Sequence, residues 1–181
     1  MLAEKLFTGE EDFQKLREKS KYVVELVDKI VYMSPASTPD HQKIQRRLCS
    51  KFMTFLNGSK CESLQTINLR LYDGNSTKIG DVFPDLSIFN NLDNSNNAFI
   101  EDIPKIIAEV VSPPSIYLDN IDKALLYKKS GIEEYWIVNI KHKTITIWDF
   151  KNGEQYIYFD SDVCSSTTFV EFSVDLKELF I

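Results

Sequence analysis

Alternating apolar and polar residues predict a series of strands along this chain. Residues 22–26 and 30–33 have the pattern of two short strands around a turn at 27–29, which predicts a hairpin. In residues 66–71, apolar side chains alternate with polar ones, as in a strand with one buried face. Further strands are predicted at 82–89, 105–111, 135–140, 144–150 and 155–159, and residues 169–180 should end in a strand or a short helix.

Helices are predicted between these strands. Residues 10–20 have weak helical character. Thr38 can cap a helix that has Pro39 in its first turn and continues to about residue 56, with the inward positions Ile44, Leu48, Phe52 and Phe55. Another helix should begin at residue 119 or 120 and end at Gly131, with the inward positions Ile121, Ala124, Leu125 and Tyr127. Strands before, between and after helices predict an α/β fold with a central mixed sheet flanked by helices.

Length and charge narrow the classes of protein. A chain of 181 residues fits one domain, which we divide into an extension at 1–35, a core at 36–150 and C-terminal strands at 151–181. The net charge of −6 excludes binding to nucleic acid through bulk positive charge, so any DNA contact must be local. The sequence contains neither an apolar run of membrane-spanning length nor an apolar signal core, so we expect a soluble cytoplasmic protein without a membrane partner. Its three cysteines lack metal-site spacing, which favours reduced thiols.

Glu109 is the first candidate for chemistry, because it lies within the most apolar predicted strand. A buried carboxylate needs a partner, which is either a structural Lys or Arg or a divalent cation. Asp85 lies in the preceding predicted strand, and the polar segment between them leaves room for the chain to return. We therefore expect the two acids to become neighbours, where they repel each other unless a cation or a shared proton intervenes.

Lys123 is the third candidate. It follows Asp119 by one helical turn and precedes Tyr127 by one turn, so these side chains share one face of the predicted helix. Lys123 either forms an ordinary helix ion pair with Asp119 or points into the acidic site. In the second case its ammonium can hold a scissile phosphate, as a metal-dependent phosphodiesterase requires.

Four short motifs follow one another in a distinctive order. They are Val82-Phe83-Pro84-Asp85, Ile107-Ala108-Glu109-Val110-Val111-Ser112-Pro113, Asp119-x3-Lys123-x3-Tyr127 and Gly131-Ile132-x-Glu134-Tyr135-Trp136. Together they resemble the Uma-two family of restriction-endonuclease-like proteins. Residues 25–28, 33–35 and 41–42 also match the family pattern, so the resemblance runs from about residue 20 to the C-terminus.

This resemblance implies the PD-(D/E)XK nuclease fold, preceded here by an N-terminal helix and a β-hairpin. In such nucleases, two acids on neighbouring strands bind Mg²⁺, for which Mn²⁺ often substitutes, and a lysine assists cleavage. Asp85 and Glu109 would be the metal-binding, catalytic acids. The usual lysine position, two residues after the second acid, holds Val111, so Lys123 would replace that lysine from the helix. A second departure is Lys29 in the hairpin turn, where the family commonly has Gly.

Other residues have weaker claims to a role. Glu25, His41 and Tyr127 are accessory candidates, although a histidine in the first turn of a helix is usually a surface or capping residue. A basic set on the helix at 39–56 could contact a nucleic-acid backbone or simply face solvent: Lys43, Arg46, Arg47 and Lys51. Asp81 is expected to be exposed.

These observations favour a Mg²⁺-dependent endonuclease that acts on DNA, with RNA as an alternative substrate. Two other hypotheses about the function remain open. One is a catalytically inactive nuclease fold that binds nucleic acid or a protein partner. The other is a purely structural protein in which Glu109 and Lys123 form a buried salt bridge. Similar nucleases often form homodimers, but no residue here demonstrates one.

Overall fold

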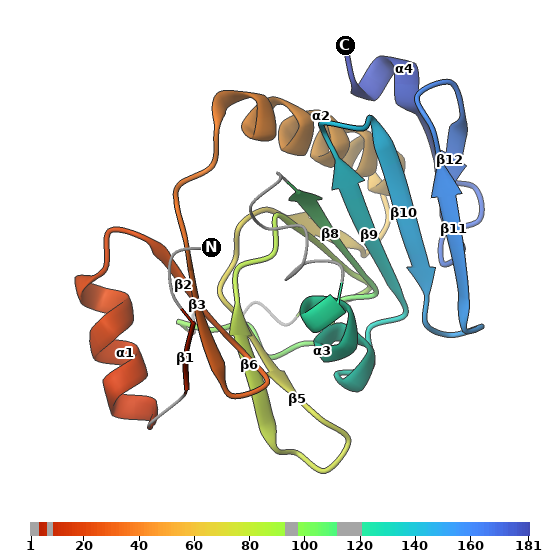
Figure 1. Cartoon of the computed structure of the whole chain (residues 1–181). Coiled ribbons are helices and arrows are strands. Elements are labelled where there is room, and N and C mark those ends of the chain that lie inside the picture. Colours follow the sequence, from red (N-terminus) through yellow and green to blue (C-terminus); the bar gives the residue numbers. More distant parts are fainter. Residues whose placement is uncertain (1–3, 7–8, 93–97, 112–120) are drawn as a thin grey trace.

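The computed structural model describes residues 4–6, 9–92, 98–111 and 121–181, which form two large β-sheets and a two-stranded one, with helices packed around them (Figure 1). Ser112, Pro113 and Asp119, which belong to the sequence motifs, lie outside the described residues. Within the described part of the chain, no helix is long and apolar enough to cross a membrane. All three cysteines are free thiols, as expected.

The first sheet is antiparallel and has five strands in the order β1-β3-β2-β6-β5. Its strands are β1 (Glu4–Leu6), β2 (Val23–Val27), β3 (Ile30–Ser34), β5 (Leu69–Tyr72) and β6 (Lys78–Val82). The predicted hairpin is present as β2 and β3, and β2 also pairs with β6. The predicted first helix is α1 (Glu10–Lys19), whose residue Phe13 is buried together with residues of β2 and β3.

The second sheet is the predicted mixed sheet and has six strands in the order β11-β10-β9-β8-β7-β4. Its strands are β4 (Glu62–Leu64), β7 (Leu86–Phe89), β8 (Ile106–Val111), β9 (Glu134–Asn139), β10 (Thr144–Asp149) and β11 (Glu154–Tyr158). The β8–β9 pair is parallel and the other pairs are antiparallel. All six residues of β8 are buried, so the apolar run around Glu109 is a central strand, as its sequence predicts.

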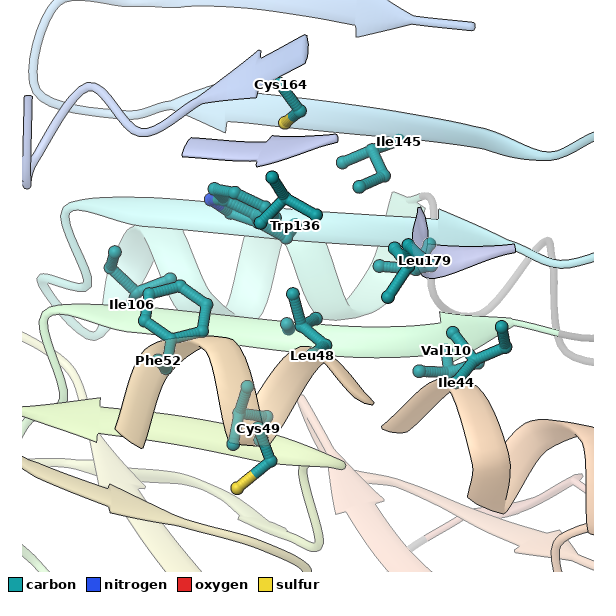
Figure 2. Close-up of a cluster of buried hydrophobic side chains, with 14 of the residues drawn as sticks. Ile44, Leu48, Cys49, Phe52, Ile106, Val110, Trp136, Ile145, Cys164 and Leu179 are labelled. Atoms are coloured by element: carbon teal, nitrogen blue, oxygen red, sulfur yellow. The ribbon is translucent and has the colours of Figure 1, made fainter. Parts of the chain in front are cut away.

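Two layers of apolar side chains hold these sheets in place. On one face of the six-stranded sheet, α2 (Pro39–Leu56) packs with the C-terminal elements β12 (Val163–Ser165), β13 (Ser173–Asp175) and α4 (Leu176–Leu179) (Figure 2). Phe52 of α2 lies there against Trp136 of β9, with ring centroids 5.7 Å apart. On the other face, α3 (Lys123–Lys129) and the five-stranded sheet cover β8 and β9.

Helix boundaries follow local chemistry. Thr38 caps α2 as predicted, because its side chain accepts a hydrogen bond from the backbone N–H of His41, and Pro39 occupies the first turn. Gly131 follows α3 with a φ of +85°, the left-handed conformation that favours glycine at a helix end.

Several sequence predictions are wrong in detail. Only the second half of the strand predicted at 82–89 forms a strand, β7. Val82 ends β6, which was not predicted and belongs to the other sheet, and residues 83–85 join the two strands. Pro84 has no N–H to continue a ladder, so the chain changes sheets there. Phe55, Ile121 and Leu125 were expected in the core but are 37%, 45% and 54% exposed. The short strands β1, β4 and β12 were not predicted, because three residues are too few to show a period.

Candidate functional site

The connection between β6 and β7 lies at the centre of the candidate site. Its backbone amides donate to two acids on other strands: Phe83 N–H to Oε1 of Glu25 on β2 at 2.9 Å, and Asp85 N–H to Oε2 of Glu109 on β8 at 3.3 Å. Acids from both sheets therefore meet where the chain crosses from one sheet to the other.

Asp85 and Glu109 are neighbours, as the sequence predicts. Oδ2 of Asp85 accepts a hydrogen bond from the backbone N–H of Val110 at 2.8 Å, directly beside Glu109 on β8. The same oxygen lies 3.0 Å from Nε2 of His41, which α2 brings to the site from its first turn. The side chains of His41 and Asp85 are 12% and 15% exposed, so this side of the site is open to solvent to a small extent.

Lys123 points into the acidic site. Its Nζ lies 2.9 Å from Oε1 of Glu109 and 3.0 Å from Oε1 of Glu25, and each of the three residues is only 4% exposed. The hydroxyl of Tyr127, one helical turn after Lys123, also donates to Oε1 of Glu109 at 2.7 Å. The ammonium of Lys123 thus reaches the second acid, although Val111 fills the usual lysine position and is buried in the apolar layer under α3.

The donor chemistry of this cluster suits a hard divalent cation. The described side chains of the site include three carboxylates, those of Glu25, Asp85 and Glu109, and the ammonium of Lys123. This ammonium pairs with the two glutamates, whereas the carboxylate of Asp85 contacts His41. In the part of the chain that the structure describes, no group of three or more His, Cys, Asp or Glu side chains is arranged to hold a metal ion. A Mg²⁺ ion needs fewer, because it binds through one or two carboxylates and keeps water and substrate phosphate oxygens as its other ligands.

The four basic residues of α2 do not form one available surface. Lys43 pairs with Asp40 at 2.9 Å and Lys51 with Glu178 at 2.7 Å. Nη1 of Arg47 donates to the backbone carbonyl of Leu179 at 3.0 Å, whereas Arg46 is exposed. At least three of these side chains are therefore engaged by groups of this chain, which weakens the case for their binding a nucleic-acid backbone.

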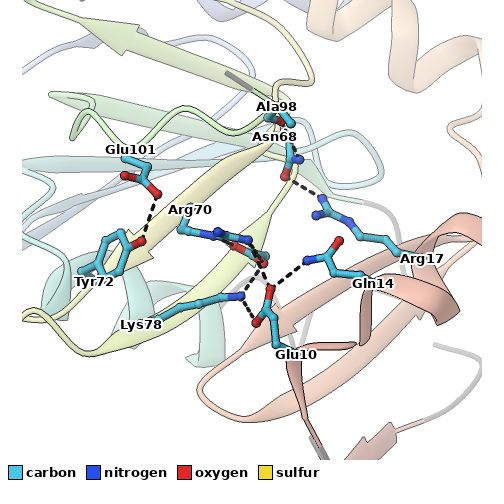
Figure 3. Close-up of polar contacts among 10 residues, drawn as sticks. Glu10, Gln14, Arg17, Asn68, Arg70, Tyr72, Lys78, Ala98 and Glu101 are labelled. Atoms are coloured by element: carbon cyan, nitrogen blue, oxygen red, sulfur yellow. Dashed lines mark hydrogen bonds and ion pairs between the residues drawn. The ribbon is translucent and has the colours of Figure 1, made fainter. Parts of the chain in front are cut away.

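Asp81 is fully buried, and the expectation that it is exposed is wrong. Its carboxylate pairs with Nε of Arg70 at 2.8 Å and with Nζ of Lys78 at 2.7 Å. Figure 3 shows Arg70 and Lys78 beside Glu10 of α1, with which both also pair. The hydrogen bond to Asp81 raises the pKa of the Arg70 guanidinium. Asp81 and Arg70 are partners across the β5–β6 pair, so this ion pair follows from strand register, which the sequence pattern does not show.

Sequence reasoning missed two neighbours of the site. Gln45 follows His41 by one turn of α2 and donates to the backbone carbonyl of Asp85 at 2.7 Å, so the four-residue spacing from His41 could have suggested it. The guanidinium of Arg17 lies 4.3 Å from the centre of the Phe83 ring. Burial lowers the pKa of Arg17, whereas the charges of Asp81 and Glu25 act in the opposite direction.

Comparisons with known proteins agree with the fold. The model of the Uma2 family, described as "Putative restriction endonuclease", matches residues 10–176. The crystal structure of a "putative nuclease belonging to DUF820" from Anabaena variabilis has a similar fold, with a TM-score of 0.78. That likeness covers 94% of this chain and 96% of the other at 16% sequence identity. No curated protein matched the sequence.

Proposed function

Because this chain belongs to the Uma2 family of restriction-endonuclease-like proteins, we propose that it is a Mg²⁺-dependent endonuclease that hydrolyses phosphodiester bonds of DNA. The position of Lys123 is the observation that carries this proposal. Its ammonium lies 2.9 Å from Glu109 although it comes from a helix rather than from the strand of Glu109. Under this proposal, Lys123 would serve as the lysine of the acid, acid and lysine set and would reach the second acid from a helix.

The acids of the site would hold the cation. Glu109 offers carboxylate oxygens from β8, Asp85 offers them from the connection that leads into the neighbouring strand β7, and Mn²⁺ could occupy the same position. When bound, Mg²⁺ would act as a Lewis acid that neutralises phosphate charge and lowers the pKa of water. Tyr127 fixes the carboxylate of Glu109 by its hydrogen bond, and His41 and the Val110 amide fix that of Asp85.

Lys123 would act on the substrate. Its ammonium can stabilise the negative charge that develops on the phosphate during cleavage, since a cation placed beforehand needs little reorganisation. Glu25 shares this ammonium with Glu109 and so fixes the direction in which it points. The two glutamates hold the buried Lys123 side chain next to the proposed cation position.

DNA binding must depend on local contacts. The chain carries a net charge of −6, and most of the basic face of α2 is already paired within the chain. The cation and Lys123 would therefore contribute much of the attraction for the scissile phosphate, and binding should weaken when the metal is removed.

A cleavage assay with two matched variants tests this proposal. Supercoiled plasmid and labelled DNA and RNA oligonucleotides are incubated with the protein in Mg²⁺, Mn²⁺ or EDTA. We expect metal-dependent cleavage of DNA that Asp85→Asn abolishes. Asp81→Asn removes a buried acid four residues earlier that pairs with Arg70 and Lys78, so its folded fraction should keep the activity.

The controls distinguish the alternatives. Melting curves of both variants establish that each is folded at the assay temperature. Cleavage of RNA alone would reassign the substrate. The endonuclease proposal is wrong if the wild-type protein cuts no nucleic acid in either metal, or if Asp85→Asn cuts as fast as the wild type does.

A further inference from the structure

The backbone around Asp85 is fixed by two residues that are outside the acid and lysine set. We propose that Gln45 and Thr66 are positioning residues that hold the Asp85 carboxylate in its metal-binding orientation. This inference rests on the proposed function, because it assigns Asp85 to the cation. It adds a part of the site that comes from α2 and from the segment between β4 and β5.

Gln45 uses both hydrogens of its amide group at the site. Its side chain is buried, and Nε2 donates to the backbone carbonyl of Asp85 at 2.7 Å and to Oγ1 of Thr66 at 3.0 Å. An amide nitrogen has two hydrogens to donate, so this pair of contacts fixes its plane. Because these hydrogen bonds are buried, the Gln45 amide restrains the Asp85 carbonyl and the Thr66 hydroxyl, and they restrain the amide.

Thr66 has a backbone conformation that is unusual for its residue type. Its φ is +48°, in the left-handed region, where a β-branched side chain is strained. Its backbone N–H donates to the carbonyl of Pro84 at 3.1 Å, while its hydroxyl accepts from Gln45. Strain of this kind persists only where surrounding contacts impose it, and here these contacts converge on the connection that carries Asp85.

Together these bonds hold the Asp85 connection from both sides. The carbonyls of Pro84 and Asp85 accept from Thr66 and Gln45, while the amide of Asp85 donates to Glu109. The carboxylate of Asp85 then accepts the N–H of Val110. Without the amide of Gln45, the peptide group after Asp85 loses its donor and can rotate, which carries the carboxylate away from Val110.

NMR on the metal-free protein tests the positioning role without any need for activity. Gln45→Met keeps the length of the side chain and removes its donor, and Gln42→Met makes the same change at an exposed position of α2. We expect the Val110 amide proton of Gln45→Met to move upfield and to exchange faster with solvent. In Gln42→Met it should behave as in the wild-type protein. An unchanged Val110 amide in Gln45→Met would refute the proposal, whatever the metal does.

Mn²⁺ affinity measured by electron paramagnetic resonance gives the consequence for the site. Loss of such a supporting contact should weaken binding roughly tenfold or more in Gln45→Met. Thr66→Gly relieves the backbone strain and removes the hydroxyl, so it should melt at a higher temperature and still bind Mn²⁺ more weakly. If Thr66 had a purely structural role, the more stable Thr66→Gly variant would bind Mn²⁺ at least as tightly as the wild-type protein. That result would also contradict the positioning role.

The two proposals fail in different ways. If the wild-type protein binds no Mn²⁺ and cuts no nucleic acid, the endonuclease proposal fails. The Val110 amide of Gln45→Met then still decides whether Gln45 orients the Asp85 side chain. If the wild-type protein binds Mn²⁺ and Gln45→Met leaves the Val110 amide unchanged, only the positioning role is wrong.

Discussion

Replacing Lys123 with methionine removes an ammonium that lies between two buried acids. Glu25 and Glu109 are each 4% exposed and lie 3.0 and 2.9 Å from Nζ of Lys123. Methionine fills a similar volume, so the change removes charge more than packing. Removing one partner of a buried ion pair costs about 3–5 kcal/mol, because the other charge stays buried without compensation. For a chain of this length that corresponds to a fall in Tm of roughly 6–20 °C.

Urea denaturation followed by circular dichroism in EDTA measures this loss. Lys129→Met is the matched control, because Lys129 lies on the same helix and pairs with Asp28 at 2.6 Å, but both side chains are about half exposed. An exposed pair contributes at most about 1 kcal/mol. A difference of less than about 1 kcal/mol between the two variants would refute the argument that Lys123 compensates buried negative charge.

A second background protects this test against a variant that does not fold. Glu109→Gln removes one of the two acids, so Lys123→Met should cost less in that background than in the wild-type protein. Contacting charged residues usually show coupling energies of about 0.5–3 kcal/mol in such a cycle. A coupling energy of zero would mean that Glu109 and Lys123 do not interact in solution.

Three further predictions concern other parts of the fold. Lys29 has a φ of +71° in the β2–β3 turn, so Lys29→Gly should raise the free energy of unfolding by about 0.5–1 kcal/mol, whereas Lys29→Ala should give no gain. Equal effects of the two in urea denaturation would contradict this. Burial acts to raise the pKa of Asp149, but hydrogen bonds from Asn152, Thr167 and the Lys151 backbone together outweigh it and hold that pKa below its ordinary value. Ionised Asp149 therefore stabilises the fold above its unfolded-state pKa, and this stabilisation is lost as the pH falls through the lower folded-state pKa. When unfolding is measured at decreasing pH, Asp149→Asn should lose less stability than the wild-type protein. An equal loss in the two proteins would contradict this. Burial also raises the pKa of the Cys164 thiol, with a further contribution from Glu134. Iodoacetamide should therefore alkylate the partly exposed Cys61 before Cys164. Mass spectrometry that finds the two cysteines modified equally fast would contradict the burial of Cys164.

Much of the site could be predicted from the sequence, because its chemistry contrasts with its surroundings. Glu109 is the one acid in a run of apolar residues, and Lys123 and Tyr127 are one helical turn apart. The structure brings these three side chains together, with Asp85 beside them. The proposed metal-binding and catalytic roles of these residues stay predictions until the assays are done.

Residues whose partners are distant in the sequence could not be placed in the same way. The sequence pattern predicts that Asp81 is an exposed acid. It is instead fully buried, and the register of the β5–β6 pair places it opposite Arg70. Gln45 reads as an ordinary helix residue, and only the packing of α2 against the β6–β7 connection reveals its bond to Asp85.

The sequence alone determined the order and type of most elements, the central position of β8 and the unusual acid within it. Those features depend on local periods of two and about four residues, which side-chain burial imposes on any strand or helix. Only the tertiary structure decided that residues 82–89 divide between two sheets, that Glu25 shares Lys123 with Glu109, and that Gln45 and Thr66 hold Asp85. Strand register and sheet membership arise from contacts between segments that are distant in the sequence. The local pattern of apolar residues does not specify which segment pairs with a given strand.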